Sequence, residues 1–238
     1  MTVRMERLCI DSIPAILYGD PSDKLYIFVH GKMGSKRDAD DFAEIAAARG
    51  YQVLSFDLPD HGDRKCQPAA GEVKNRCSVQ QAVPELRAVL AYAQERWNKI
   101  SLFGCSIGAY FSLMAFQQVR FERCLFQSPV VDMPHLIGKM FLWFGVTEAQ
   151  LERAGEIETP VDVLSWPYYR YAMEHPVTEW PSDTRILYAE QDDLQDFSVI
   201  QRFADQFGCL LTVAEGCNHA FNGDGQPARV HQWMKDQI

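Results

Sequence analysis

The 238-residue chain lacks the features that mark several large classes of protein. It has no apolar run of the roughly 18–20 residues that a membrane-spanning helix needs. Its first residues include Arg4, Glu6 and Arg7 rather than an apolar core followed by small residues, so we expect no secretory signal. No repeat and no low-complexity segment is present. These absences favour an ordinary globular domain, long enough to bury a substantial core.

An excess of positive charge is missing as well. The formal net charge is −9 and the pI is near 5.1, which argues against binding to nucleic acid or to an anionic membrane surface. The seven cysteines are odd in number and have no paired spacing, so we expect reduced thiols and a cytoplasmic location. The histidines show no metal-ligand spacing, and we expect neither a metal nor an organic cofactor.

The most informative segment that is present is Gly104–Gly108, with the sequence GCSIG. It follows the apolar stretch Ile100–Phe103 and precedes a helix-like run over 109–119. A G-x-S-x-G sequence between a strand and a helix is typical of a nucleophile elbow, a tight turn that exposes a serine hydroxyl. The bare motif also occurs by chance, so other residues must support it. Ser106 is the candidate nucleophile, and Cys105 is expected to pack beneath the turn.

Two residues further along the chain suit the roles of acid and base. Asp192 follows the apolar run Ile186–Ala189, and His219 follows the apolar run Leu210–Ala214. Both therefore lie just beyond the C-terminal ends of predicted strands, on the edge where open α/β sheets place their ligands. The order along the chain is Ser, Asp, His.

Backbone donors for an oxyanion are predicted from a third segment. His30 and Gly31 close the apolar run Leu25–Val29. Acyl transfer to a serine passes through an oxyanion, which requires preorganised hydrogen-bond donors. A loop that leaves a strand beside the elbow can offer one backbone N–H, and the residue after the serine can offer another. The backbone N–H groups of Lys32 and Ile107 are the candidates.

With these residues in place, the sequence resembles the α/β-hydrolase-fold serine hydrolases over nearly its whole length. Residues 30–36 (HGKMGSK) are similar to a motif of bacterial esterases and serine-aminopeptidase-like hydrolases that carry a small cap. Residues 55–63 (SFDLPDHGD) are similar to the family's strand-4 loop, D-x-x-G-H-G-x-S. This loop departs from the pattern at Asp60, where glycine is usual, and at Arg64, where serine is usual. It shapes the fold more than the chemistry.

The resemblance implies a mechanism. His219 would take the proton of Ser106 and later give it to the leaving group, while Asp192 would hold the imidazole in the correct tautomer. The family's pattern before the acid favours Asp192 over Asp193, which we expect to cap a helix predicted over 194–207. Asp132 is an alternative acid, because some relatives place it after the strand that precedes the cap.

Strand and helix signals alternate along the chain. The strand signals cover 8–10, 15–18, 25–29, 53–56, 100–103, 124–127, 186–189 and 210–214, and the helix signals cover 38–49, 83–97, 109–119, 194–207 and 226–237. Pro84 lies within one helix signal, where a helix either begins or is kinked. The alternation predicts an α/β fold with a mostly parallel central sheet and helices on both faces. Together with the resemblance, it indicates one α/β-hydrolase domain over residues 1–238.

The stretch of about 130–182 is too long for a simple crossover and is rich in aromatic residues. The resemblance implies that it is a helical cap inserted over the active site. We expect Met140, Trp143 and Phe144 to line an apolar pocket for the acyl or alcohol group. The alternative is that such aromatic residues pack the cap onto the body.

The function favoured by these residues is hydrolysis of small to medium carboxylic esters through an acyl-enzyme on Ser106. An aminopeptidase, an amidase or a thioesterase could use the same residues. An aminopeptidase would need an acidic residue that grips a free amine, for which Glu148, Glu152, Glu156 and Glu158 are candidates by position, although a solvated face explains them equally. A non-catalytic receptor for a small molecule is the alternative of another class, since a fold does not establish a function. Nothing in the sequence indicates the oligomeric state.

Overall fold

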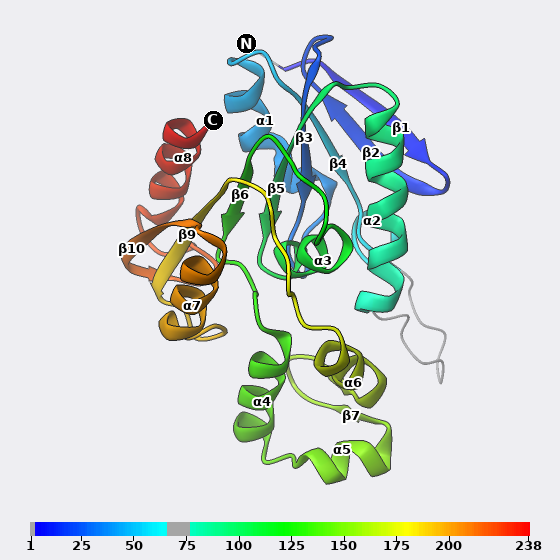
Figure 1. Ribbon diagram of the computed structural model, residues 1–238, viewed down its shortest axis with the longest axis vertical. Coiled ribbons are helices and arrows are strands. Elements are labelled where there is room, and N and C mark those ends of the chain that lie inside the picture. Colours follow the sequence, from blue (N-terminus) through cyan, green and yellow to red (C-terminus); the bar gives the residue numbers. More distant parts are fainter. Residues whose placement is uncertain (1–2, 66–76) are drawn as a thin grey trace.

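A computed structural model describes residues 3–65 and 77–238 and shows an eight-stranded sheet through the body of the protein (Figure 1). The strand order is β1-β2-β4-β3-β5-β6-β9-β10. The pairs β1–β2 and β2–β4 are antiparallel, and the other neighbours pair in parallel. The predicted mostly parallel sheet is confirmed. The strands are β1 (Met5–Ile10), β2 (Ile13–Tyr18), β3 (Lys24–Val29), β4 (Gln52–Phe56), β5 (Lys99–Cys105), β6 (Cys124–Gln127), β9 (Thr184–Gln191) and β10 (Leu210–Asn218).

Helices cover both faces of this sheet, as predicted. Side chains alternate along β3: Tyr26 and Phe28 join the apolar cluster of one face, and Leu25 and Ile27 join that of the other. The first cluster includes α1 (Asp40–Ala47) and α8 (Gln226–Gln237), and the second includes α2 (Val79–Gln94), α3 (Ile107–Ala115) and α7 (Phe197–Phe207).

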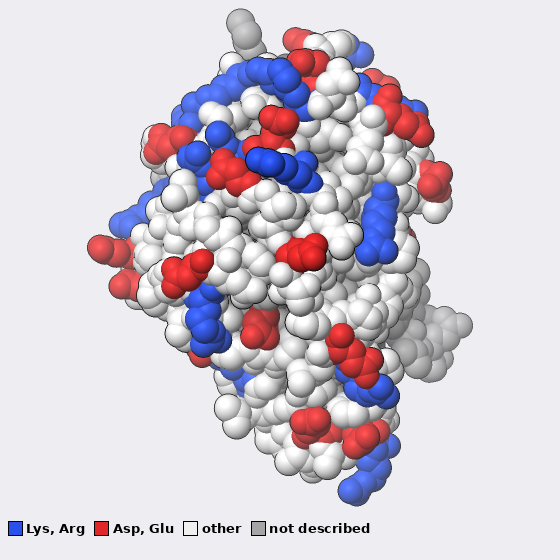
Figure 2. Space-filling model, in the orientation of Figure 1, with Lys and Arg blue, Asp and Glu red and all other residues white. Residues whose placement is uncertain are grey.

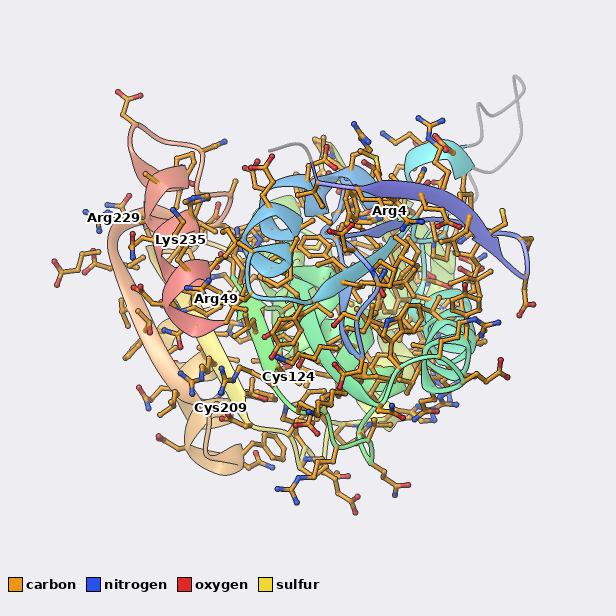
Figure 3. The ribbon with its side chains drawn as sticks, turned by 90° about the horizontal axis from the view of Figure 1, so that it is seen from above. Arg4, Arg49, Cys124, Cys209, Arg229 and Lys235 are labelled. Carbon is orange, nitrogen blue, oxygen red and sulfur yellow. The ribbon has the colours of Figure 1, made fainter. Side chains whose placement is uncertain are left out.

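Arg49 and Lys235, both labelled in Figure 3, join the ends of α1 and α8. The guanidinium of Arg49 donates to the backbone carbonyl of Lys235 at 2.5 Å. The two helices of this face are therefore tied to each other as well as to the sheet.

Two helix boundaries differ from the sequence expectation. Helix α3 ends at Ala115 rather than near residue 119, because Phe116 leaves the helical conformation and its ring packs on that of Phe121. Helix α2 begins at Val79, where Ser78 caps it, so Pro84 lies inside the helix in its second turn. Of the two alternatives at Pro84, the helix starting there is wrong.

The chain between β6 and β9, residues 128–183, is here called the insertion. It contains α4 (Met133–Phe144), α5 (Glu148–Ala154) and α6 (Trp166–Glu174), and it lies beyond the C-terminal ends of the parallel strands, at the lower end of Figure 1. It also contains an antiparallel hairpin, β7 (Glu156–Glu158) and β8 (Val163–Ser165), that the sequence did not predict. A helical insertion is thus present at the expected place.

The surface and the thiols are unexceptional. Acidic and basic side chains are interspersed on the face shown in Figure 2. Within residues 3–65 and 77–238, every helix is too short or too polar to span a membrane.

The cysteines of the described ranges are free thiols, and burial raises the pKa of Cys209 to about 12 and also raises that of Cys124 (Figure 3). Cys66 lies outside the described residues.

Candidate active site

Ser106 stands at the sharp turn between β5 and α3. Its backbone has φ 50° and ψ −119°, a conformation that costs a non-glycine residue about 1–3 kcal/mol. The turn is possible because its neighbours are glycines. A Cβ atom at Gly108 would lie 2.4 Å from the backbone oxygen of His30, and one at Gly104 would lie 2.8 Å from the Cα atom of Ala109. The helix therefore begins directly against the end of β3.

A continuous chain of hydrogen bonds connects Ser106, His219 and Asp192. The Ser106 Oγ atom lies 2.9 Å from His219 Nε2, and His219 Nδ1 lies 2.7 Å from Asp192 Oδ2. A carboxylate can only accept, so the proton between His219 and Asp192 resides on Nδ1 and leaves Nε2 free to accept from the serine hydroxyl. The structure thus brings the three predicted residues together, in the tautomer that a general base requires.

Backbone N–H groups, as well as His219, fix the side chain of Asp192. Its side chain is fully buried, and its second oxygen, Oδ1, accepts the backbone N–H groups of Leu194 and Gln195 at 2.8 and 3.1 Å. One carboxylate therefore closes the turn after β9 and faces the imidazole at the same time.

The expectation for Asp193 is wrong. Helix α7 begins at Phe197 with Asp196 at its N-cap, and the free N–H groups of the preceding turn are satisfied by Asp192 instead. The alternative acid, Asp132, is the N-cap of α4, where its carboxylate accepts the backbone N–H of His135 at 2.9 Å.

Two residues that the sequence analysis missed support the backbone around His219. Ser128, which is buried and has φ 42°, donates its hydroxyl to the carbonyl of His219 at 2.8 Å. Gln226 donates to the carbonyl of Gly216 at 3.0 Å and accepts the N–H of Asn218 at 3.2 Å. Neither residue belongs to a recognisable motif, and the Ser128 contact joins segments that are 91 residues apart in the chain.

The predicted oxyanion positions border Ser106. Lys32 and Met33 occupy the centre of a turn closed by the N–H of Gly34 and the carbonyl of Gly31, at 3.2 Å. A Cβ atom added at Gly31 would lie 3.4 Å from Ser106 Cβ, so this turn passes beside the serine.

Ile107 is the first residue of α3, where an N–H has no acceptor within the helix. The side chain of Lys32 pairs with Asp162 in the hairpin of the insertion. The turn that carries Lys32 is therefore in contact with the insertion.

The ring of His30 supports the backbone of this region through two hydrogen bonds. Its Nδ1 atom donates to the carbonyl of Gly31 at 2.7 Å, and its Nε2 atom accepts the N–H of Leu58 at 3.1 Å. Burial lowers the pKa of His30 to about 4, so the ring is neutral at pH 7. The neutral ring links the ends of β3 and β4 beneath the Lys32 turn.

The loop after β4 accommodates both of its departures from the family's pattern. Asp60 adopts φ 60°, the left-handed region that glycine enters most easily and that aspartate tolerates. Arg64 forms a bidentate pair with Glu85 of α2 at 2.6 and 2.7 Å. Inside the loop, the buried carboxylate of Asp57 pairs with the ammonium of Lys36 at 2.5 Å. The two departures, Asp60 and Arg64, therefore affect the conformation of the loop and make no contact with Ser106, His219 or Asp192 in the interactions described.

The predicted pocket residues lie on α4. Met140 is buried in the main apolar cluster, whereas Trp143 is 44% exposed and packs against the ring of Phe144. Glu148, Glu152, Glu156 and Glu158 are all exposed.

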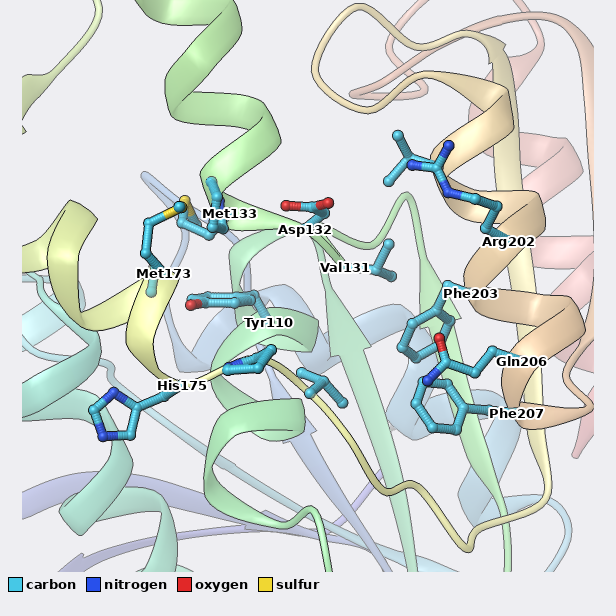
Figure 4. A pocket seen from close by; sticks show the side chains of 15 residues that line it. Tyr110, Val131, Asp132, Met133, Met173, His175, Arg202, Phe203, Gln206 and Phe207 are labelled. Atoms are coloured by element: carbon cyan, nitrogen blue, oxygen red, sulfur yellow. The ribbon is translucent and has the colours of Figure 1, made fainter. Parts of the chain in front are cut away.

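A cavity of about 340 Å³ lies between α3, the start of α4, the end of α6 and α7 (Figure 4). Tyr110, Met133, Met173 and Phe203 are among its lining residues. Met140, Trp143 and Phe144 do not line it, and neither do Ser106, His219 and Asp192.

The described ranges, 3–65 and 77–238, contain no group of three or more histidine, cysteine or acidic side chains that could hold a metal ion. The site itself consists of a hydroxyl, an imidazole and a buried carboxylate, with backbone N–H groups beside them.

Comparison with known proteins gives the family. The profile of the alpha/beta hydrolase family matches residues 26–233, and the chain belongs to this family. No curated protein matches the sequence. The resemblance noted from the sequence and the predicted fold class are confirmed.

Solved structures share the fold at low sequence identity. Est1E from Butyrivibrio proteoclasticus, solved with ferulic acid bound, is 19% identical with a TM-score of 0.75, over 97% of this chain and 96% of its own. A putative hydrolase from Agrobacterium vitis S4 is 14% identical with a TM-score of 0.75, over the whole of both chains. The Pyrococcus furiosus esterase PF2001 is 16% identical with a TM-score of 0.68, over 98% of this chain and 89% of its own. At these identities the likeness shows the fold alone. Membership of the family supports hydrolysis as the class of reaction.

Proposed function

We propose that the protein is a serine hydrolase that cleaves small to medium carboxylic esters, with Ser106, His219 and Asp192 as its catalytic triad. The observation that carries the proposal is the unbroken hydrogen-bond chain from Ser106 Oγ through His219 to the buried carboxylate of Asp192. A purely structural role would not require a strained serine at the end of such a chain.

The reaction follows from this geometry. Ser106 Oγ attacks the ester carbonyl while His219 Nε2 takes its proton, and the same proton then passes to the departing alkoxide. Water attacks the resulting acyl-enzyme with His219 again as the base, and the carboxylic acid leaves. The buried Asp192 stabilises the imidazolium that forms in each half of the cycle. The N–H groups of Lys32 and Ile107 would bind the oxyanion.

The acyl pocket in this proposal lies between the body and the insertion. The turn that carries Lys32 passes beside Ser106, and Tyr110 follows Ser106 by one turn of α3, which supports this location. The α4 residues Met140, Trp143 and Phe144 would form a more distant part of its wall. Water exclusion by the insertion would strengthen the electrostatic contacts at the reacting carbonyl.

The test is hydrolysis of p-nitrophenyl esters of increasing acyl length by the wild type and by Ser106→Ala. We expect turnover in the wild type and a loss of at least about 10³-fold in the variant. Ser182→Ala is the matched control, because Ser182 is a buried serine whose hydroxyl bonds the backbone of Val119 and Phe121. It precedes the start of β9, whereas Asp192 follows the opposite end of that strand. The control variant should retain full turnover.

Other substrates separate the alternatives. Methyl ferulate belongs in the series because Est1E was solved with ferulic acid. An aminoacyl p-nitroanilide and an acyl thioester test amide and thioester cleavage by the same triad. Absence of turnover on all of them, together with no labelling of Ser106 by a fluorophosphonate, would overturn the hydrolase proposal and favour a receptor.

A further inference from the structure

Gln195 is fully buried, and every hydrogen-bonding group of its side chain has a partner. Its Oε1 atom accepts the backbone N–H groups of Val131 and Asp132 at 3.0 and 2.9 Å. Its Nε2 atom donates to the carbonyls of Asp132 and Leu194 at 3.1 and 3.3 Å. An amide side chain offers two donors and two acceptor lone pairs, so this one makes every bond that it can. Val131 and Asp132, labelled in Figure 4, lie in the insertion between β6 and α4.

The main chain of the same residue contacts the site. The N–H of Gln195 donates to Asp192 Oδ1 at 3.1 Å, and its carbonyl accepts the hydroxyl of Tyr188 at 3.0 Å. The other oxygen of Asp192 faces His219 Nδ1 at 2.7 Å. A path of hydrogen bonds therefore runs from the imidazole to residue 195 and on to the start of the insertion.

Filling space does not explain an amide at this position. A side chain that only filled the space could be apolar, because an amide loses its contacts with water on burial and its hydrogen bonds do little more than compensate. What the amide adds is a fixed geometry, since a fully satisfied buried network holds its members in one arrangement. The members here are the start of the insertion and the turn whose N–H groups bind Asp192.

We propose that Gln195 is a positioning residue for Asp192. Its side chain fixes residue 195 to the start of the insertion, and its N–H thereby fixes the carboxylate against His219. The inference rests on the proposed function, in which Asp192 is the acid of the triad. It means that the insertion does more than cover the site, because the backbone of its first residues helps to orient the triad.

The test begins with Gln195→Met, which keeps the length of the side chain and removes the amide. Two N–H groups and two carbonyls lose their partner, and we expect kcat for a p-nitrophenyl ester to fall by roughly ten- to hundredfold. The loss should stay below the roughly 10⁴-fold that a wrong imidazole tautomer costs. Because Gln195 acts through Asp192, KM should remain within about twofold.

Gln52→Met is the matched control. Gln52 is also a buried glutamine, and its Oε1 atom accepts the indole N–H of Trp97 at 2.9 Å and the backbone N–H of Ser22 at 3.3 Å. It is the first residue of β4, at the opposite end of the parallel strands from the triad. The control should lower the melting temperature and keep its kcat. Wild-type kcat in Gln195→Met, or an equal loss in Gln52→Met, would overturn the inference while ester hydrolysis by the wild type still stands.

Tyr188→Phe provides a milder variant that leaves the side chain of Gln195 in place. It removes the hydroxyl that binds the carbonyl of residue 195, so kcat should fall by about two- to fivefold, the range that one hydrogen bond supports. If Gln195→Met does not fold, this variant decides: a fall in kcat supports the inference, and an unchanged kcat contradicts it.

A second readout does not depend on turnover. The proton that His219 Nδ1 shares with Asp192 should give a far-downfield NMR signal, because this hydrogen bond is short. We expect the signal in the wild type and in Gln52→Met, and its loss or upfield shift in Gln195→Met. That result supports the positioning role even if the wild type cleaves no ester, and an unchanged signal in Gln195→Met contradicts it. Failure of the catalytic proposal is therefore recognisable separately.

Discussion

The hydroxyl of Ser128 provides a sharp test of how the site is positioned. It donates to the backbone carbonyl of His219 at 2.8 Å and comes from the end of β6, whereas His219 follows β10. Ser128→Ala removes the donor and leaves a carbonyl without its partner in a region where Ser128 is 1% exposed. We therefore expect the imidazole to lose part of its fixed position relative to Ser106.

The magnitude follows from two separate effects. An unsatisfied buried acceptor lowers the free energy of unfolding by about 1–3 kcal/mol. A misplacement of about 1 Å at a reacting group can lower the rate by roughly 100-fold, so a shift of a few tenths of an ångström predicts a loss of about tenfold in kcat. KM should change little, because Ser128 positions His219 and does not reach the substrate.

The assay measures kcat and KM for a p-nitrophenyl ester together with urea unfolding. Ser128→Gly separates the hydroxyl from the backbone strain at φ 42°, since glycine relieves the strain but has no hydroxyl. It should recover stability relative to Ser128→Ala and remain as slow. Ser182→Ala should lose comparable stability and keep its kcat. Full kcat in both Ser128 variants would refute the reasoning.

Three further predictions concern the surroundings of the site. The pKa of His30 is about 6.5 in the unfolded chain and about 4 in the folded protein, so its contribution of about 3 kcal/mol to the free energy of unfolding is complete above pH 6.5 and is lost as the pH falls toward 4. Urea unfolding at pH 7 and 4.5 should therefore show a smaller loss of the free energy of unfolding in His30→Asn than in the wild type. Equal losses in the two proteins contradict the prediction. The Lys32–Asp162 pair is half-exposed, so Asp162→Asn should change the free energy of unfolding by less than about 1 kcal/mol, and the difference should disappear in high salt. Gly108→Ala should destabilise the protein by at least about 2 kcal/mol, because the added Cβ would clash with the His30 carbonyl. Gly138→Ala in α4 should stabilise it by about 0.5–1 kcal/mol, because the added Cβ would contact no other atom. Thermal unfolding distinguishes the two variants, and similar changes in melting temperature would contradict the packing argument.

Much of the fold could be predicted because its signals are local. A strand buried on both faces is a short apolar run, and the run 186–189 lies within β9, which covers 184–191. The C-terminal helix was expected over 226–237, the range that α8 occupies. The elbow was also visible, since its glycines, its serine and the flanking strand and helix are adjacent in the chain.

The rest depends on contacts between distant segments. Asp193 was a reasonable helix cap by position, but the turn that follows β9 gives its N–H groups to Asp192. Ser128 gains its role only when β6 and the end of β10 come together. The hairpin of the insertion was missed because strands of three residues contain too few side chains to show alternation.

The insertion has a narrow base. Met133 at the start of α4 and Met173 at the end of α6 border the same cavity, so the two ends of the intervening chain meet (Figure 4). A segment closed at its base can be exchanged for another without changing the register of any strand in the sheet. The hydroxyl, imidazole and carboxylate lie outside this segment, on the body. Residues 133–173 can therefore be exchanged as a unit while Ser106, His219 and Asp192 keep their positions on the body.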